Sequence, residues 1–292
     1  MSIVMSLSVG EGDMFYIKHN TDNFTMIDCC MDEDNKRAIV ELLRAESKDK
    51  GVVRFISTHP DGDHIKGLAY LNRETDLLNF YCVDNETTMP DETEDFKEYC
   101  TLRDDSKKAF YLYRGCARRW LNLDSEERKS AGISVLWPVL DNRYFREELD
   151  NVRAGMSPNN ICPIIKYGLK NGVAILWMGD LMEEFMEKIE LNFSMDAADI
   201  LFAAHHGRDK VPDKWLKEMN PKMVVIGEAP SEDVNYYMGY NTITQNSAGH
   251  ITLECLAGKT HVYVSNRRYS VNFLENQGVS DTYGKYIGTL LL

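Results

Sequence analysis

The chain has 292 residues, of which 43% are hydrophobic and 27% charged, as in an ordinary folded globular protein. Its 33 Lys and Arg stand against 46 Asp and Glu, and the net charge of −13 argues against a protein that coats nucleic acid by general electrostatic attraction. No run reaches the roughly 18 apolar residues of a membrane-spanning helix, so no membrane partner is expected. The start lacks the features of a signal peptide, and seven irregularly spaced cysteines predict a reduced, cytoplasmic protein.

The first third of the chain predicts strands and one helix. Apolar runs at 2–9 and 14–18 are separated by Gly10-Glu11-Gly12-Asp13, a hairpin connection. A third short strand is expected at 24–28. A helix over 36–48 follows, and then a compact buried strand at 52–57.

Residues 84–130 are more charged and aromatic, and we interpret them as an inserted helical segment or lid, with helices around 95–100 and 107–121. Later strands are expected at 133–137, 163–167, 173–177, 200–204 and 223–226, helices at 181–190 and 213–219, and a closing hairpin at 251–255 and 260–264. These elements predict one mixed α/β domain over residues 1–292 with two sheets.

The most informative stretch follows the buried strand at 52–57. It places His59, Asp61, Asp63 and His64 within six residues, and Pro60 and Gly62 exclude a regular strand or helix interior. A tight loop can turn all four donors toward one point, where a divalent cation would remove the repulsion between the carboxylates. The alternative is a solvated polar turn, and we favour metal binding.

Two further apolar strands end in polar residues. Asp180 follows the strand at 173–177, where it serves equally well as a metal ligand or as the N-cap of the next helix. His205 and His206 follow the strand at 200–204, and a pair of imidazoles at a strand end is harder to explain as structure alone. Together these segments supply enough donors for two divalent ions, Zn or Mn, with Mg also compatible with the carboxylates.

These segments, in this order, resemble the metallo-β-lactamase fold superfamily. The loop from His59 to His64 is similar to its HxHxDH signature, with Asp61 where the second histidine usually stands. The resulting HxDxDH variant resembles the soluble metallohydrolase domain of ComEC-type DNA-uptake proteins. Shorter segments resemble other motifs of that branch, namely 9–13 (VGQGD), 27–28 (the strand end that follows it), 157–162 (NNxS), 178–181 (TGDL), 205–207 (HHG) and 244–251 (TDQNGAI).

The resemblance implies a four-layer αββα sandwich with a helical insertion and with metals at one rim. It implies that Asp180 bridges the two ions and that Asp63 also orients the attacking water. One of the two histidines at 205 and 206 would be a ligand and the other would face the substrate, because adjacent strand residues point to opposite faces. The implied ligands are His59, Asp61, Asp63, His64, Asp180 and either His205 or His206.

The chain departs from the family pattern at several positions. The third metal histidine is missing, and Asn159 or Asn160 occupies its region as a substrate-binding candidate. Cys162 replaces a serine, and Arg208 places a fixed cation beside the predicted site, which favours an anionic substrate such as a phosphodiester.

The leading hypothesis is a phosphodiesterase or nuclease that uses a metal-bound hydroxide, with Asp63, Asp180, His205 and His206 as the catalytic residues. Its substrate would be a phosphodiester, a nucleotide or a single-stranded nucleic acid. The basic and aromatic residues of 107–120 fit nucleic acid, although a solvated helix is the preferred reading of that segment. The alternatives are a hydrolase of small esters, lactones or thioesters, and a metal-binding protein with little turnover that works with a protein partner.

Overall fold

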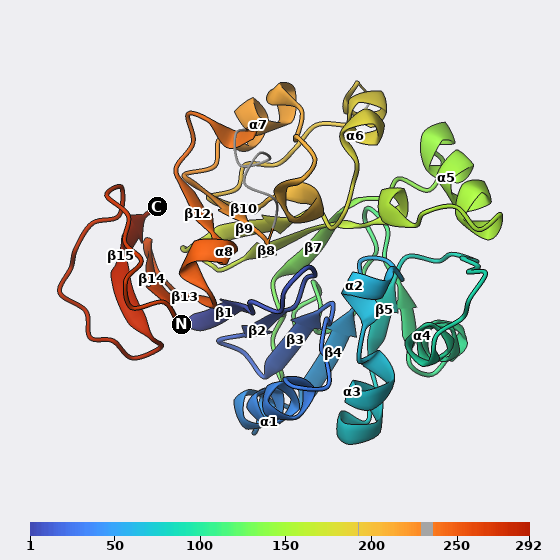
Figure 1. The fold of residues 1–292 in the computed structure, drawn as a ribbon, viewed down its shortest axis with the longest axis horizontal. Coiled ribbons are helices and arrows are strands. Elements are labelled where there is room, and N and C mark those ends of the chain that lie inside the picture. Colours follow the sequence, from blue (N-terminus) through green and yellow to red (C-terminus); the bar gives the residue numbers. More distant parts are fainter. Residues whose placement is uncertain (192, 229–235) are drawn as a thin grey trace.

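In the computed structural model, two β-sheets pack face to face between two outer layers of helices (Figure 1). The structure describes residues 1–191, 193–228 and 236–292. The nine-stranded sheet has the order β15-β14-β13-β1-β2-β3-β4-β5-β6, and the six-stranded sheet has the order β12-β11-β10-β9-β8-β7. This is the αββα sandwich expected from the sequence. None of the helices in the described ranges is long and apolar enough to cross a bilayer.

The first sheet is built mainly from the two ends of the chain. Its strands are β1 (Ser2–Ser6), β2 (Phe15–Lys18), β3 (Asn23–Ile27), β4 (Val52–Ile56), β5 (Phe80–Cys82), β6 (Ala109–Tyr111), β13 (Ile251–Leu256), β14 (Lys259–Val264) and β15 (Lys285–Leu291). Helices α1 (Lys36–Ser47), α3 (Leu68–Thr75) and α4 (Glu94–Asp104) cover part of its outer face. The chain does not close on the predicted hairpin, because β15 adds a further strand beside β14.

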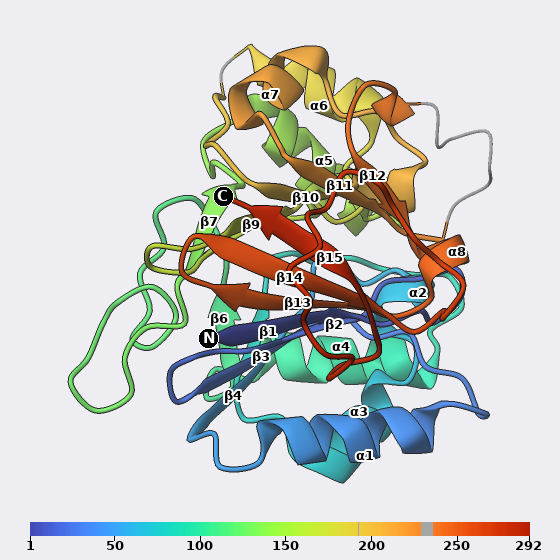
Figure 2. The ribbon, with the colours of Figure 1, turned by 90° about the vertical axis from the view of Figure 1, so that its left-hand side faces the viewer.

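The second sheet lies in the middle of the chain. Its strands are β7 (Ile133–Trp137), β8 (Ile164–Gly168), β9 (Ala174–Trp177), β10 (Ile200–Phe202), β11 (Met223–Ile226) and β12 (Thr242–Thr244). Helices α5 (Arg143–Arg153), α6 (Glu183–Glu190) and α7 (Asp213–Met219) form its outer layer, and the short elements are α2 (Gly62–Ile65), η1 (Asn159–Ile161), η2 (Ala204–Gly207) and α8 (Gln245–Ala248). In Figure 2 the layer of α5, α6 and α7 lies at the top and the strands of the first sheet lie below it.

The prediction of a helix over 107–121 is wrong. Residues Ala109–Tyr111 form β6, which pairs in parallel with β5, and the chain after it is irregular. The burial of the next residues also differs from that of an amphipathic helix, because buried Leu112 lies between exposed Tyr111 and Tyr113. The first predicted helix of this region is confirmed as α4, which packs against α3 and β5. The role of residues 84–130 as a lid stays a prediction.

Parallel pairing places the chemically important loops at one end of the sandwich. Strand β4 lies parallel to β3 and β5 in the first sheet, and β10 lies parallel to β9 and β11 in the second. The carboxyl ends of parallel strands meet at one edge of a sheet. The loops after β4, β9 and β10 therefore converge where the two sheets face each other.

Candidate metal centre

The loop after β4 is fixed by a buried aspartate from the neighbouring strand. Asp28, directly after β3, accepts hydrogen bonds from the backbone N–H and the hydroxyl of Thr58, at 2.7 and 2.6 Å. Its Oδ2 also lies 2.9 Å from Nδ1 of His64, and all three residues are buried. Because Asp28 holds Nδ1, the opposite nitrogen of His64, Nε2, is turned toward the centre of the site.

Asp180 is the central residue of the site. Its Oδ1 lies 3.1 Å from Nε2 of His64. Its Oδ2 faces the Nε2 atoms of three further histidines: His59 at 3.9 Å, His205 at 3.6 Å and His206 at 3.5 Å. Both carboxylate oxygens of one buried residue are thus surrounded by imidazole nitrogens from two different loops, an arrangement that suits a bridging ligand.

Two more carboxylates complete the cluster. Nε2 of His206 lies 3.4 Å from Oδ2 of Asp63, and Nδ1 of the same ring lies 3.2 Å from Oδ1 of Asp13. One donor atom from each of Asp13, His64, Asp180 and His206 falls within 4.8 Å of the other three. Donors from the β1–β2 hairpin, β4, β9 and β10 therefore meet at one point.

The donors fit a divalent metal ion. Within the described ranges, Nε2 of His59, His64 and His206 and Oδ1 of Asp180 are all buried and have no hydrogen-bond partner. Buried polar atoms normally find partners, because an unsatisfied one costs about 1–3 kcal/mol. Four such atoms in one cluster of imidazoles and carboxylates are the donor set that Zn²⁺ or Mn²⁺ would satisfy.

The carboxylates of the cluster favour protonated imidazoles at two positions, His64 and His206. Burial alone would lower the pKa of His64, but the carboxylates of Asp180 and Asp28 raise it well above its usual value. Burial likewise opposes a charged His206, yet Asp13, Asp180 and Asp63 raise its pKa strongly. His59 differs, because burial lowers its pKa to about 3 and leaves it neutral.

We expect metal uptake at neutral pH to release protons. A metal ligand must be neutral imidazole, so His64 and His206 would each give up a proton on binding, about two in total. Calorimetric titration of Mn²⁺ or Zn²⁺ into the protein, in buffers of different ionisation enthalpy, measures this number from the buffer dependence of the enthalpy. Affinity should also fall as the pH is lowered. A binding enthalpy that is the same in every buffer would contradict the expectation.

The two adjacent histidines do not point to opposite faces. Strand β10 ends at Phe202, and the histidines lie in the following turn with left-handed φ values of 49° at His205 and 57° at His206. In this turn both Nε2 atoms face Asp180. Their surroundings differ, because the His206 side chain is fully buried, whereas the His205 side chain is 21% exposed and holds Asp209 Oδ2 at 2.5 Å through Nδ1.

Other predicted site residues lie around the cluster without joining it. The carboxylate of Asp61 caps α2 by accepting a hydrogen bond from the Gly62 backbone N–H at 2.7 Å. Asn160 accepts a hydrogen bond from the Met182 N–H near the start of α6, and Asn159 accepts one from the Ser157 hydroxyl. Arg208 follows the histidine turn and is half-buried. The roles of these residues as ligand or substrate contacts stay predictions.

Sequence reasoning missed three carboxylates of the site, namely Asp13, Asp28 and Asp209. Asp13 lay in a segment interpreted only as a hairpin connection and a family motif. The residue before it, Gly12, is the sequence feature that could have indicated a close approach here. In the structure, an added Cβ at Gly12 would lie 2.5 Å from the Asp63 backbone oxygen. The hairpin and the metal loop therefore approach each other closely only because residue 12 has no side chain.

The unusual cysteine contacts the central carboxylate. Sγ of buried Cys162 accepts a hydrogen bond from the Asp180 backbone N–H at 3.2 Å. Gly179, with φ of 54°, lies against the same sulfur. Cys162 thus accepts a hydrogen bond within the turn that presents Asp180.

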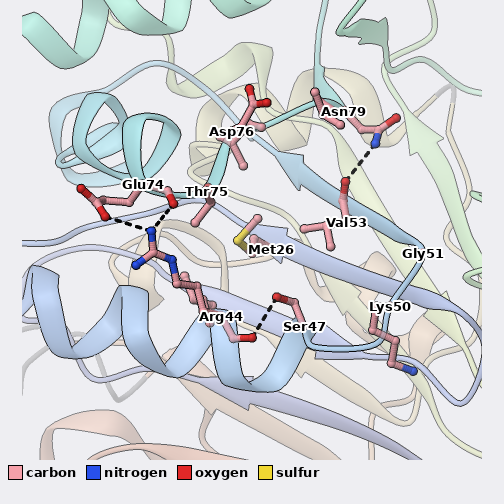
Figure 3. A pocket seen from close by; sticks show the side chains of 13 residues that line it. Met26, Arg44, Ser47, Lys50, Gly51, Val53, Glu74, Thr75, Asp76 and Asn79 are labelled. Carbon is pink, nitrogen blue, oxygen red and sulfur yellow. Dashed lines mark hydrogen bonds and ion pairs between the residues drawn. The ribbon is translucent and has the colours of Figure 1, made fainter.

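A hollow of about 390 Å³ lies away from this centre, on the outer side of the first sheet (Figure 3). Arg44 of α1 crosses beside it to Glu74 of α3, with an N–O distance of 2.9 Å. Asn79 donates a hydrogen bond to the Val53 carbonyl at its far side. None of the residues that line it belongs to the metal cluster, so the hollow plays no part in the chemistry considered below.

Residues 7–141 match the model of the metallo-beta-lactamase superfamily. The match includes Asp13 and the His59–His64 loop and ends before Asp180. No curated protein matches the chain significantly. Among solved structures, the metallo-beta-lactamase SMB-1 in complex with mercaptoacetic acid is 12% identical, covers 70% of this chain and 81% of its own, and has a TM-score of 0.38.

Residues 7–141 are therefore similar to the metallo-beta-lactamase superfamily. Most members of this class are metallo-hydrolases, and they typically hold divalent metals such as zinc. The cluster of Asp13, His64, Asp180 and His206 could hold such a metal ion.

Proposed function

We propose that this protein is a metal-dependent phosphodiesterase or nuclease with a dinuclear centre around Asp180. The observation that carries the proposal is the position of Asp180 itself, with one oxygen beside His64 and the other beside His59, His205 and His206. A carboxylate with donors on both sides can bridge two ions. The ions would be Zn²⁺ or Mn²⁺, with Mg²⁺ as a further candidate.

Bound divalent ions would lower the pKa of water and neutralise charge on phosphate oxygens. The residues proposed to hold them are Asp13, His59, Asp63, His64, Asp180 and His206, with Asp61 as a candidate if its carboxylate leaves the Gly62 N–H. Asp63 is 30% exposed in its side chain, unlike the buried histidines, so it can also accept a proton from the attacking water.

His205 is suited to protonate the leaving oxygen. Its Nδ1 is held by Asp209, whose other oxygen accepts a hydrogen bond from the Glu183 backbone N–H at 2.8 Å. This fixes the ring with Nε2 toward the centre, and the ring is partly open to solvent and therefore to substrate. Arg208 would bind a phosphate oxygen, which together with the resemblance to ComEC-type metallohydrolase domains favours a phosphodiester over an uncharged ester.

The test is a matrix of metals and substrates. Purified protein is loaded with Mn²⁺, Zn²⁺ or Mg²⁺ and incubated with bis(4-nitrophenyl) phosphate, cyclic nucleotides, single-stranded DNA, and a panel of lactones and thioesters. We expect metal-dependent cleavage of phosphodiesters. Cleavage of the lactones or thioesters alone would establish the small-ester alternative. Tight metal binding without turnover of any substrate would favour a binding protein that works with a protein partner.

The proposed compartment is the reducing cytoplasm. All seven cysteines lie in the described part of the chain and none forms a disulfide.

A further inference from the structure

A strip of basic and aromatic side chains lies outside the metal centre. Residues 107–120, here called the basic strip, contain five Lys and Arg and no Asp or Glu, in a chain with a net charge of −13. Tyr111 and Tyr113 each expose 37% of their surface, and Arg114, Arg118 and Arg119 are exposed as well. The strip is a local reversal of charge on an acidic protein.

The first half of the strip lies at the same end of the sandwich as the metal centre. Strand β6 is parallel to β5, and β5 is parallel to β4, so Tyr113 and Arg114 follow a strand end on the same side as the His59–His64 loop. The Arg114 backbone N–H donates to the Pro138 carbonyl, just after β7. Since β6 and β7 are edge strands of the two sheets, the strip occupies the side of the sandwich where the sheets end.

The second half runs to the opposite end. Asn79, Tyr81, Ala117, Arg118, Arg119 and Trp120 line a hollow of about 390 Å³. Asn79 precedes the amino end of β5, which places this hollow about one strand length from the rim of the site. Figure 2 shows the light-green loop between β6 and β7 at the end away from α2 and α8.

A buried cation contacts two residues that line this hollow, Tyr81 and Trp120. Arg54 of β4 is fully buried and donates to three neutral oxygens, at 2.9 Å to Thr25 Oγ1, 2.6 Å to Asn23 Oδ1 and 2.9 Å to the Trp120 carbonyl. Its Nε has no partner, and no carboxylate in the described ranges forms an ion pair with it. A buried charge without a counter-ion is weakly screened, so its field adds to that of the surface arginines.

Two arginines of the strip contact aromatic rings instead of acids. The Arg118 guanidinium carbon lies 5.2 Å from the centre of the Phe110 ring, and that of Arg114 lies 5.2 Å from the centre of the Phe193 ring. Neither forms an ion pair within the described ranges, whereas Arg119 lies 3.7 Å from Glu127. Arg114 and Arg118 are therefore positioned cations that still have donors for an anionic ligand.

We propose that the basic strip binds single-stranded nucleic acid and guides it to the metal centre. Arg114 and Arg118 would contact backbone phosphates, and unpaired bases would stack on Tyr111 and Tyr113. Exposed rings next to cations without acidic partners suit a single strand, whose phosphates carry negative charge and whose unpaired bases can stack on aromatic side chains. The proposed binding to the strip is argued from the strip's own residues. The proposal that the strip guides the strand to the metal centre rests on the proposed function.

The test compares two charge-matched variants. Arg114→Glu/Arg118→Glu alters the strip, and Lys188→Glu/Lys217→Glu makes the same charge change at exposed positions of α6 and α7. Binding is measured by fluorescence anisotropy with a labelled phosphorothioate single strand of about 20 nucleotides, longer than the roughly 4–16 nucleotides of a typical single-strand site. Such a strand keeps the backbone charge and resists hydrolysis.

We expect the strip variant to bind at least about 10-fold more weakly than wild type, with a salt dependence shallower by about 1.4 for two lost phosphate contacts. The control should stay within about threefold. The milder Arg114→Gln/Arg118→Gln variant should also weaken binding, which guards against misfolding of the charge reversal. No binding by the wild type, or equal losses in strip variant and control, would overturn the proposal.

Hydrolysis of bis(4-nitrophenyl) phosphate separates this inference from the proposed function. The substrate is too small to reach the strip, so the strip variants should hydrolyse it like wild type. Strip-dependent binding without any phosphodiester cleavage would refute the proposed function and leave the binding surface standing. Normal cleavage with unchanged DNA binding in the strip variants would do the reverse.

Discussion

Asp180→Asn should lower kcat/KM for a phosphodiester by about 100-fold or more and remove most of the bound metal. Asn keeps the size of the side chain but takes away the negative charge that faces four imidazoles. The measurements are elemental analysis after dialysis and initial rates with Mn²⁺. The fold should survive, because Cys162 contacts the backbone of residue 180 and not its carboxylate.

Asp61→Asn is the matched control from the loop after β4. In this structure Asp61 acts as a helix cap, and asparagine caps α2 equally well. We expect metal content and kcat/KM to stay within a few-fold of wild type. If Asp61→Asn loses metal as completely as Asp180→Asn, then Asp61 leaves its cap when metal binds, and the ligand role expected from the HxDxDH motif is correct.

The second large effect separates the two adjacent histidines. His206→Ala should abolish metal retention, since this ring is fully buried between Asp13, Asp63 and Asp180. His205→Ala should keep the metal and lower kcat on a nucleotide phosphodiester by about 100-fold, a typical contribution of a general acid. Elemental analysis and single-turnover rates distinguish the two outcomes.

The leaving group provides the control for His205. 4-Nitrophenolate leaves without a proton, so His205→Ala should cleave bis(4-nitrophenyl) phosphate at nearly the wild-type rate. Asp209→Asn should show the same selectivity in weaker form, because it only loosens the ring that Asp209 orients. A His205→Ala protein that is equally slow on both substrates would refute the role of proton donor.

The strands and the principal metal residues could be predicted from the sequence because their signals are local. An apolar run that ends in polar residues marks a strand end, and this pattern located His59, His64, Asp180 and the histidine pair. Parallel pairing then brings such ends together, as the structure shows.

The rest depended on long-range contacts that no local pattern carries. Asp28 looks like any strand-end residue until β3 and β4 pair and bring it to His64. The prediction of a helix at 107–121 was wrong because residues 109–111 pair with β5. A strand of three residues is too short to leave a recognisable pattern in the sequence. The prediction that His205 and His206 point to opposite faces was wrong because both residues have left-handed backbone conformations in place of strand geometry. Two consecutive left-handed residues are rare where neither is glycine.

The division of the metal centre between the two sheets has a mechanical consequence. His64 and Asp63 belong to one half of the sandwich, and Asp180 and His206 belong to the other. An ion held by donors from both halves would link the two sheets at the edge where they face each other. Any motion that separates the halves would move Asp180 and His206 away from the ion and weaken its binding, so the affinity for the ion would depend on how closely the two sheets pack.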